Sequence, residues 1–260
     1  MAEAQLTLTR LNRFPVKGLS AEQLETVTLD AGQGIPGDRF FGFARHGSGF
    51  DPQNPQPLPK DRFVVLANQA ALAGLKTRFD PRTNTLDIRS GQSRQFDMGN
   101  TEGRDAAALY LYETLALSDP EPPTFVSSTP HRFTDVSVVS SQMMNAVSVL
   151  NLASVRAVEE RLDVEIDPAR FRANLEIDGL PPFVELDSVG STFHLGDVAL
   201  RILARTKRCA ATEVNPDTAE RDLKLPYLLR KELGHMDMGI YAEVVSGGTL
   251  AIGQTGHFAG

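Results

Sequence analysis

The stretch VALRILARTKRCAATEVNPDT occupies residues 198–218, and it says more than any other about both the fold and the candidate site. Its first part, Val198 to Ala204, has the length and apolar composition of a buried strand. Basic residues and then Cys209 follow directly. We therefore expect a long strand with the cysteine at its end.

Short strand-like runs dominate the rest of the chain. They cover Leu6 to Leu11, Leu24 to Leu29, Phe63 to Ala67, Asn174 to Ile177, Ile240 to Val245 and Leu250 to Ile252. Helical spacing or caps predict helices at Asn68 to Leu75, Arg104 to Leu115, Leu152 to Leu162 (capped by Asn151 or Ser154) and Pro226 to Leu233. The pattern predicts a mixed α/β, β-rich fold with barrel-like sheets and short helices rather than a doubly wound fold.

Proline-rich segments indicate how the chain is divided. The cluster Asp119-Pro120-Glu121-Pro122-Pro123 follows a predicted helix and cannot continue it. We therefore predict an N-terminal β-barrel-like domain over residues 1–120 and a second domain over residues 121–260. The segment from His46 to Lys60 has four prolines and two glycines, which predicts a long exposed loop of the kind that often carries function.

Composition excludes several classes of function. A net charge of -7 in 260 residues disfavours binding to nucleic acid or to an anionic membrane surface. No apolar stretch reaches membrane-span length and the first ten residues lack a signal layout, so we expect a cytoplasmic protein. A single cysteine excludes an internal disulfide, a CxxC redox pair and an iron–sulfur cluster held by four cysteines of this chain.

The neighbours of Cys209 predict a reactive thiol. Arg205, Lys207 and Arg208 lie within five residues of it, and nearby cations favour the thiolate, which is the nucleophile and the soft-metal ligand. The alternative is that Cys209 is a small buried apolar side chain. His235 is a candidate base for a cysteine nucleophile, although a histidine after a helix end more often caps or packs.

Two further segments predict anion binding. In extended chain, Arg170, Arg172 and Asn174 would share one face and form a fork of donors, unless the arginines pair with the acidic residues around them. Lys17 beside Gly18 in a turn, with Arg39 after a Gly-Asp pair, would supply further cations, unless these are ordinary surface residues.

Taken together, these segments resemble the MOSC superfamily, named for the C-terminal domain of molybdenum-cofactor sulfurases. The stretches that carry the resemblance are Arg13 to Gly18, Gly37-Asp38-Arg39, Phe171 to Asn174, Leu195-Gly196-Asp197, Arg208 to Thr218 and Gly239 to Val244. The N-terminal part resembles the β-barrel domain that precedes MOSC in the amidoxime-reducing and YcbX-like members. The chain departs from the family pattern at Ala219 and Gln254, neither of which is a candidate ligand.

The resemblance implies a molybdopterin site between the two portions, with a MOSC-type β-barrel in the second. It implies that Cys209 ligates molybdenum and is the catalytic residue. The residues that would bind the pterin and its phosphate are Lys17, Gly18, Arg39, Ser148, Asn151, Arg172, Asn174, Lys207 and Arg208.

The resemblance leaves the chemistry open between two activities. Amidoxime-reducing members reduce N-hydroxylated small molecules with electrons from a partner protein, and sulfurase members carry a persulfide on the cysteine, fed by a pyridoxal-phosphate cysteine desulfurase. The sequence shows neither a desulfurase domain nor a ferredoxin tail, so both reactions would need a separate partner. The N-terminal portion favours the molybdenum-dependent oxidoreductase. A non-catalytic module that binds an anionic ligand is a third hypothesis.

Overall fold

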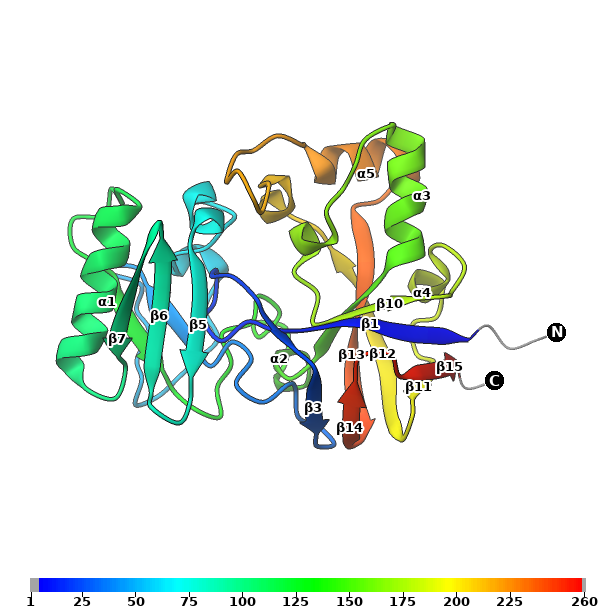
Figure 1. The fold of residues 1–260 in the computed structure, drawn as a ribbon, viewed down its shortest axis with the longest axis horizontal. Coiled ribbons are helices and arrows are strands. Elements are labelled where there is room, and N and C mark those ends of the chain that lie inside the picture. Colours follow the sequence, from blue (N-terminus) through cyan, green and yellow to red (C-terminus); the bar gives the residue numbers. More distant parts are fainter. Residues whose placement is uncertain (1–4, 259–260) are drawn as a thin grey trace.

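A computed structural model describes residues 5–258 as a β-rich, mixed α/β fold (Figure 1). The strands are β1 (Leu6–Arg13), β2 (Glu22–Leu24), β3 (Thr26–Leu29), β4 (Phe41–Ala44), β5 (Lys76–Asp80), β6 (Thr85–Ser90), β7 (Gln92–Asp97), β8 (Thr124–Ser127), β9 (Val147–Asn151), β10 (Leu175–Asp178), β11 (Thr192–Leu195), β12 (Val198–Lys207), β13 (Asp237–Ser246), β14 (Gly248–Ala251) and β15 (Thr255–Phe258). The α-helices are α1 (Thr101–Thr114), α2 (Ser141–Met144), α3 (Leu152–Leu162), α4 (Val184–Asp187) and α5 (Leu225–Leu233). Short 3₁₀ helices cover Lys60–Arg62, Ala70–Gly74, Pro168–Phe171 and Ala210–Glu213.

Seven strands close into a barrel in the order β10-β9-β13-β12-β11-β15-β1, and β1 pairs with β10 to complete the circle. Alternate residues of these strands point inward, as a period of two requires, and Leu8, Leu175, Leu200 and Val244 are among the buried core residues. The predicted β-rich fold with a barrel is therefore confirmed.

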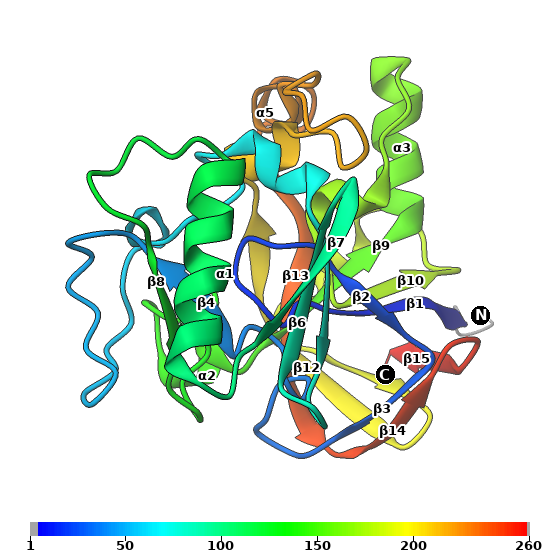
Figure 2. The ribbon, with the colours of Figure 1, turned by 60° about the vertical axis from the view of Figure 1, so that its left-hand side comes forward.

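A second body of structure lies beside the barrel. The three-stranded sheet β5-β6-β7 packs against α1, and Figure 2 shows the helix lying along the sheet. Leu86 and Ile88 of β6 meet Ala107 and Leu111 of α1 in a separate core cluster. Asn100 caps α1 by accepting a hydrogen bond from the amide of Gly103, so the helix begins three residues before the predicted Arg104.

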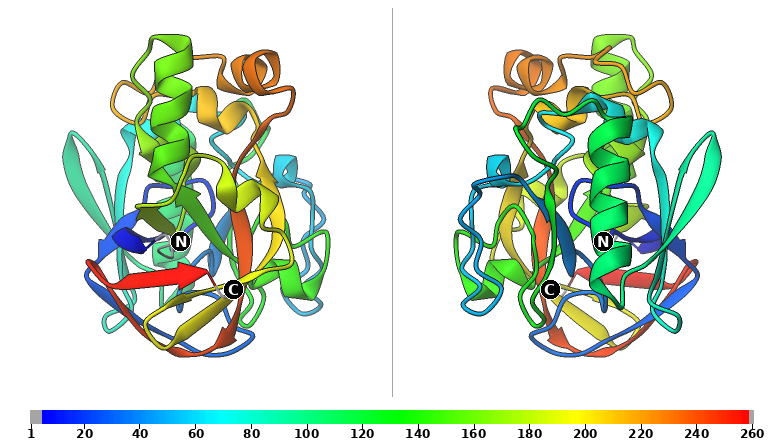
Figure 3. Two further views of the ribbon diagram at one scale, coloured as in Figure 1. Left: turned by 90° about the vertical axis from the view of Figure 1, so that its right-hand side faces the viewer. Right: turned by 90° about the vertical axis from the view of Figure 1, so that its left-hand side faces the viewer.

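Helices α3 and α5 lie at the same end of the barrel in both views of Figure 3. Asn151 caps α3, accepting a hydrogen bond from the amide of Ala153, which confirms one of the two predicted caps. Pro226 lies in the first turn of α5, and Gly234 ends that helix in the left-handed conformation.

The prediction of a strand over Phe63 to Ala67 is wrong. Only Phe63 forms an isolated bridge, to Ala44, and the chain then turns, with the amide of Asn68 donating to the carbonyl of Val65. The run is buried because it packs between two core clusters, and burial alone produced the strand-like pattern. Asn68 does not cap the next helix, whose N-cap is Gln69 without a side-chain hydrogen bond.

The predicted domain boundary near residue 120 stays a prediction. Chain order and spatial neighbourhood differ here, because β1 belongs to the barrel while β8, after the proline cluster, pairs with β4. Among residues 5–258, no helix has the length and apolar character needed to cross a membrane.

Candidate functional site

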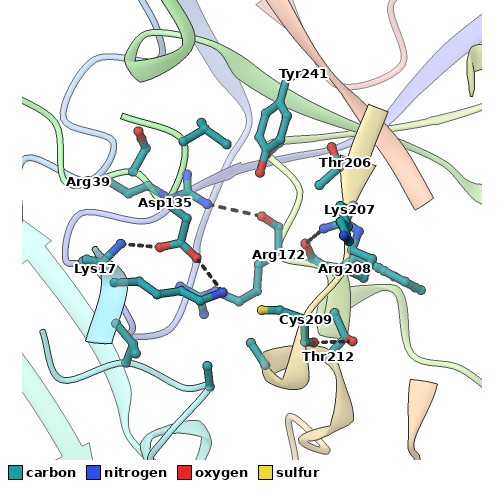
Figure 4. A pocket seen from close by; sticks show the side chains of 18 of the residues that line it. Lys17, Arg39, Asp135, Arg172, Thr206, Lys207, Arg208, Cys209, Thr212 and Tyr241 are labelled. Carbon is teal, nitrogen blue, oxygen red and sulfur yellow. Dashed lines mark hydrogen bonds and ion pairs between the residues drawn. The ribbon is translucent and has the colours of Figure 1, made fainter. Parts of the chain in front are cut away.

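A pocket of about 470 Å³ lies where the barrel meets the N-terminal part of the chain, and Figure 4 shows many of its side chains. We call it the cysteine pocket. Eight lysine and arginine residues line it against one carboxylate, Asp135. The lining lysines and arginines are Lys17, Arg39, Lys60, Arg170, Arg172, Arg205, Lys207 and Arg208. In a chain of net charge -7, this concentration of cations predicts an anionic ligand.

Cys209 lies just after the end of β12, as the sequence predicts. It is also the N-cap of the 3₁₀ helix Ala210–Glu213, which the sequence did not predict. Its carbonyl oxygen accepts hydrogen bonds from the amide and the hydroxyl of Thr212, at 3.0 and 2.9 Å, which fixes the turn. The thiol is free and half-buried, and its sulfur points into the pocket (Figure 4). The alternative hypothesis, that Cys209 is enclosed in the hydrophobic core, is therefore wrong.

Lys17 and Lys60 hold the carboxylate of Asp135 between them. The Lys17 ammonium donates hydrogen bonds to Asp135 Oδ1 and, at 3.0 Å, to the carbonyl oxygen of Phe133, while Lys60 Nζ lies 3.8 Å from Asp135 Oδ2. Burial lowers the pKa of Lys17 although Asp135 opposes the shift. Burial also acts to raise the pKa of Asp135, but Lys17 and Lys60 outweigh it and hold that pKa below its ordinary value.

Lys60 lines the same pocket as Cys209. Burial acts to lower the pKa of Lys60, but its neighbours, Cys209 first and then Asp135, raise it above its ordinary value. Lys60 is therefore a cation that remains protonated in the cysteine pocket.

Gly18 allows Lys17 to reach this position. Its φ of +83° lies in the left-handed region, and a Cβ there would lie 2.6 Å from the carbonyl oxygen of Val64. Only glycine fits this turn without displacing the neighbouring backbone.

Arg39 and Arg172 lie on the ring of Phe14, with guanidinium carbons 4.6 and 4.5 Å from its centroid. Both have φ of +52°, a left-handed conformation that costs free energy in a residue other than glycine. Burial and the neighbouring Arg39 lower the pKa of Arg172 to about 10. Two like charges are thus held together at strained positions, an arrangement that an anion between them would stabilise.

Asn174 and Ser148 form the polar floor beside these arginines. Asn174 Oδ1 accepts hydrogen bonds from the amide and the hydroxyl of Ser148, and its Nδ2 donates to Asp38 Oδ1 at 3.0 Å. Arg39 also donates to Asp38. The network orients Arg39 toward the pocket.

Three buried donors in the pocket wall have no partner among the described residues. Arg208 donates to the carbonyl oxygens of Met238 and Phe171 through Nε and Nη1, but its Nη2 makes no hydrogen bond. The hydroxyl of Thr206 and the Nε of Arg170 make none either. Burial lowers the pKa of Arg208 to about 10. Unpartnered buried donors are costly, and a ligand with acceptor atoms would satisfy them.

The structure brings together nine of the ten residues predicted for the site. These are Lys17, Gly18, Arg39, Ser148, Arg172, Asn174, Lys207, Arg208 and Cys209. Asn151 does not line the pocket. It is fully buried and donates from Nδ2 to Pro181 O and Glu185 Oε2 while it caps α3, so its role is to stabilise the barrel end.

The predicted fork of Arg170, Arg172 and Asn174 does not form as expected. The segment Pro168–Phe171 is a 3₁₀ helix and Arg172 is left-handed, so alternate side chains do not share a face. Arg170 instead pairs through Nη2 with both oxygens of Asp222, at 2.7 and 2.8 Å, and not with the acidic residues before it in sequence.

Arg205 and His235 serve elsewhere. Arg205 lies at the edge of the pocket, but its guanidinium pairs with Asp187. The Nδ1 atom of His235 accepts a hydrogen bond from the amide of Asp237, and His235 does not line the pocket. The structure therefore does not support His235 as a base for Cys209.

Sequence reasoning missed Lys60, Asp135 and Tyr241, which all line the pocket. Lys60 ends the long proline-rich loop, whose unusual length was the available signal. Tyr241 lies in a segment that carries the family resemblance, and burial raises its pKa. Asp135 carries no local signal, because its partners Lys17 and Lys60 come from distant parts of the chain.

Comparison with known proteins agrees with this geometry. Residues 130–255, which include Cys209, match the MOSC domain family. The chain is a MOSC-domain protein. The match covers the segments of the MOSC domain that supply Asp135, Arg172 and Cys209, whereas Lys17, Arg39 and Lys60 precede it.

Curated relatives of this MOSC protein carry two kinds of name. It is 29% identical over 250 residues to the molybdenum cofactor sulfurase of Drosophila willistoni, covering 90% of this chain and 30% of the relative. It is 31% identical over 202 residues to the molybdenum cofactor sulfurase of Drosophila pseudoobscura pseudoobscura, and the alignment covers 74% of this chain and 24% of that relative. It is 36% identical over 78 residues to mitochondrial amidoxime-reducing component 1 of Mus musculus, and the alignment covers 30% of this chain and 22% of that relative. The chain therefore spans under a third of the length of these relatives.

Among solved structures, the chain aligns with the YuaD protein from Bacillus subtilis. The alignment covers 98% of this chain and 97% of that one, with 16% sequence identity and a TM-score of 0.44.

Proposed function

We propose that this MOSC protein binds the molybdenum cofactor in the cysteine pocket, with Cys209 as the protein ligand of molybdenum. The observation that carries the proposal is the free thiol of Cys209 in a pocket wall that holds eight basic residues and one carboxylate. Molybdenum in this cofactor favours soft sulfur ligands, and the cofactor's phosphate needs cations.

The polar atoms of the pocket fit such a group. Arg39 and Arg172, stacked on Phe14, would hold the phosphate. The unpartnered Arg208 Nη2 and Thr206 hydroxyl would donate to acceptor atoms of the pterin. Lys207, exposed at the end of β12, would add a further cation at the mouth.

We propose an oxidoreductase activity on N-hydroxylated or similar small molecules. The reaction takes two electrons and two protons to convert an N-hydroxy group to N–H and water, and the electrons would come from a separate donor protein. When bound, the cofactor supplies a metal that exchanges an oxygen atom and two electrons. The name of the mouse relative supports this activity.

The test is metal and pterin analysis of protein made in a host that synthesises the cofactor. Wild-type protein should contain near-stoichiometric molybdenum and reduce benzamidoxime with dithionite-reduced viologen as electron donor. Cys209→Ser should lose most of the activity, whereas Arg156→Met, at a residue that does not line the pocket, should not. Protein free of both metal and pterin under these conditions would overturn the proposal.

The second candidate is a sulfur carrier that uses a Cys209 persulfide. It is favoured by the alignment with a molybdenum cofactor sulfurase, which extends over 90% of the chain at 29% identity. A pyridoxal-phosphate cysteine desulfurase would then be the partner. Mass spectrometry after incubation with such an enzyme and cysteine should find one added sulfur on wild-type protein and none on Cys209→Ser. Absence of the adduct on the wild type would retire this candidate.

A further inference from the structure

The segment from Asn215 to Asp222 does not line the cysteine pocket, although its first residues belong to a stretch that carries the family resemblance. We call it the 215–222 loop. Asn215 Oδ1 accepts hydrogen bonds from the amides of Asp217 and Thr218, at 2.9 and 3.2 Å. The amide of Asn215 donates to the carbonyl oxygen of Glu220 at 2.8 Å. An asparagine that binds its own backbone in this way makes a tight turn, which fixes the two residues that end the loop.

The loop presents Arg221 to residues 209–213, which carry Cys209 and which we call the cysteine turn. Arg221 forms an isolated bridge with Val214, directly after that turn. Its Nη1 donates to the carbonyl oxygen of Ala210 at 2.7 Å and lies 3.4 Å from Glu213 Oε2. A hydrogen bond from a guanidinium group is stronger than one between neutral groups. The backbone directly after Cys209 is therefore held from outside the pocket.

The other arm of Arg221 reaches the N-terminal portion of the chain. Its Nη2 donates to the carbonyl oxygens of Ala67 and Leu66, at 2.6 and 3.3 Å. Both residues line the cysteine pocket and precede the region that matches the MOSC family, and we call them the N-terminal wall. One planar guanidinium thus joins two parts of the pocket that are distant in sequence. The compact ammonium of a lysine reproduces this geometry only in part.

Asp222 supports the same turn through a second arginine. Its carboxylate accepts hydrogen bonds from Arg170 Nη2 and, at 2.7 Å, from Asn215 Nδ2. Arg170 Nη1 in turn donates to the carbonyl oxygen of Glu213 at 3.2 Å. Neighbouring residues of the loop therefore fix both ends of the 3₁₀ helix that follows Cys209.

We propose that Arg221 is a positioning residue: it holds the cysteine turn against the N-terminal wall and so fixes the place of the Cys209 sulfur in the pocket. Residues outside a site set the geometry of the ligand inside it, and their loss lowers activity although they touch no reactant. The inference rests on the proposed function, because a fixed sulfur matters when it binds the metal or carries a persulfide.

The first test measures the reactivity of Cys209 in the full chain, made in a host that does not synthesise the cofactor. Because Cys209 is the only cysteine, mass spectrometry follows its reaction with iodoacetamide, a small reagent, and with fluorescein-5-maleimide, a bulky one. The small reagent enters the pocket as it stands, whereas the bulky one requires the wall to open. Arg221→Met should raise the bulky-to-small ratio of rate constants at least about tenfold, because loss of the tether favours local opening. The ratio cancels any change in the ionisation of the thiol.

Three further variants complete this test. Arg230→Met, at an exposed arginine of α5 outside the pocket, is the matched control and should keep the wild-type ratio. Arg221→Lys keeps the charge but spans the two walls poorly, so its ratio should lie between those of wild type and Arg221→Met. Asn215→Ala removes the turn that shapes the loop and should reproduce Arg221→Met. An unchanged ratio in folded Arg221→Met, or in folded Asn215→Ala if Arg221→Met does not fold, would overturn the proposal.

A second readout separates this inference from the proposed function. In protein loaded with molybdenum, Arg221→Met should lower kcat for benzamidoxime per bound molybdenum at least about fivefold and change KM less than about twofold. An unaltered kcat would contradict the positioning role. If wild-type protein takes up no molybdenum, the proposed function fails, and the ratio of the two reagents still decides the role of Arg221.

Discussion

Arg39 Nη2 donates a hydrogen bond to the carbonyl oxygen of Arg172 over 3.4 Å, across 133 residues of sequence. The same two side chains lie on the ring of Phe14 and share the left-handed backbone conformation. Like charges at strained positions are expensive to maintain, and such strain collects at functional sites. Asp38 neutralises part of this charge, and an anionic ligand between the two guanidinium groups would stabilise the pair further.

Replacement of Arg172 should separate stability from binding. Because burial holds the pKa of Arg172 at about 10, its charge is unfavourable in the folded state, and Arg172→Met should raise the free energy of unfolding by about 1 kcal/mol. The same variant should bind inorganic phosphate at least about tenfold more weakly. Urea denaturation and calorimetry measure the two effects. Arg156→Met, at an exposed ion pair with Asp178, should leave phosphate binding unchanged; a loss of stability together with full phosphate binding in Arg172→Met would refute this account.

Asp135→Asn should increase the affinity of the cysteine pocket for inorganic phosphate. The carboxylate competes with any anion for Lys17 and Lys60, so its removal should improve phosphate binding by about three- to tenfold. The variant should also be less stable, because buried Lys17 loses its counter-ion. Calorimetry at low ionic strength is the measurement, with Asp178→Asn as the control outside the pocket. Unaltered phosphate affinity would show that Asp135 does not compete.

The two asparagines of the predicted site should behave differently. Asn151→Ala should lower the free energy of unfolding by about 2 kcal/mol, because α3 loses its cap and Glu185 loses a donor. Its phosphate affinity should match the wild type. Asn174→Ala, in contrast, should weaken phosphate binding, because Asn174 holds the hydrogen-bond network that orients Arg39. Weaker phosphate binding by Asn151→Ala would contradict the placement of Asn151 outside the site, and wild-type binding by Asn174→Ala would contradict the role given to Asn174.

The pH dependence of stability should show opposite signs at Glu185 and Glu243. Burial raises the pKa of Glu185 above its ordinary 4.5, with hydrogen bonds from Asn151 and Ser154 in partial opposition. Its contribution to stability is therefore complete below pH 4.5 and is lost as the pH rises through the raised pKa. Hydrogen bonds from Gln142 and then Arg201 lower the pKa of Glu243, whose contribution is present above pH 4.5 and is lost as the pH falls through the lowered pKa.

Chemical denaturation of wild type, Glu185→Gln and Glu243→Gln between about pH 3 and 8 measures these contributions. The stability difference between wild type and Glu185→Gln should shrink or reverse with rising pH, and that for Glu243→Gln should shrink with falling pH. The same slope in both variants would show that their environments are not distinct.

Local patterns were enough to predict most elements of the barrel. The apolar run from Val198 placed β12 and put Cys209 at its end, and Pro226 with Gly234 placed α5, because these signals act over a few residues. The same reasoning failed at Phe63 to Ala67, where contact with two core clusters buries a segment that has no strand partner along its length.

The amino-acid sequence by itself determined which residue types this protein has for its chemistry, one thiol and clusters of cations in an acidic chain, and the strands and turns that carry them. Only the tertiary structure decided which of them meet. It turned Arg170 to Asp222, kept Asn151 out of the pocket, and brought Lys60 and Asp135 to Cys209. Strand periodicity is a short-range property of the chain, whereas these meetings depend on closure of the barrel and on contacts between residues far apart in sequence.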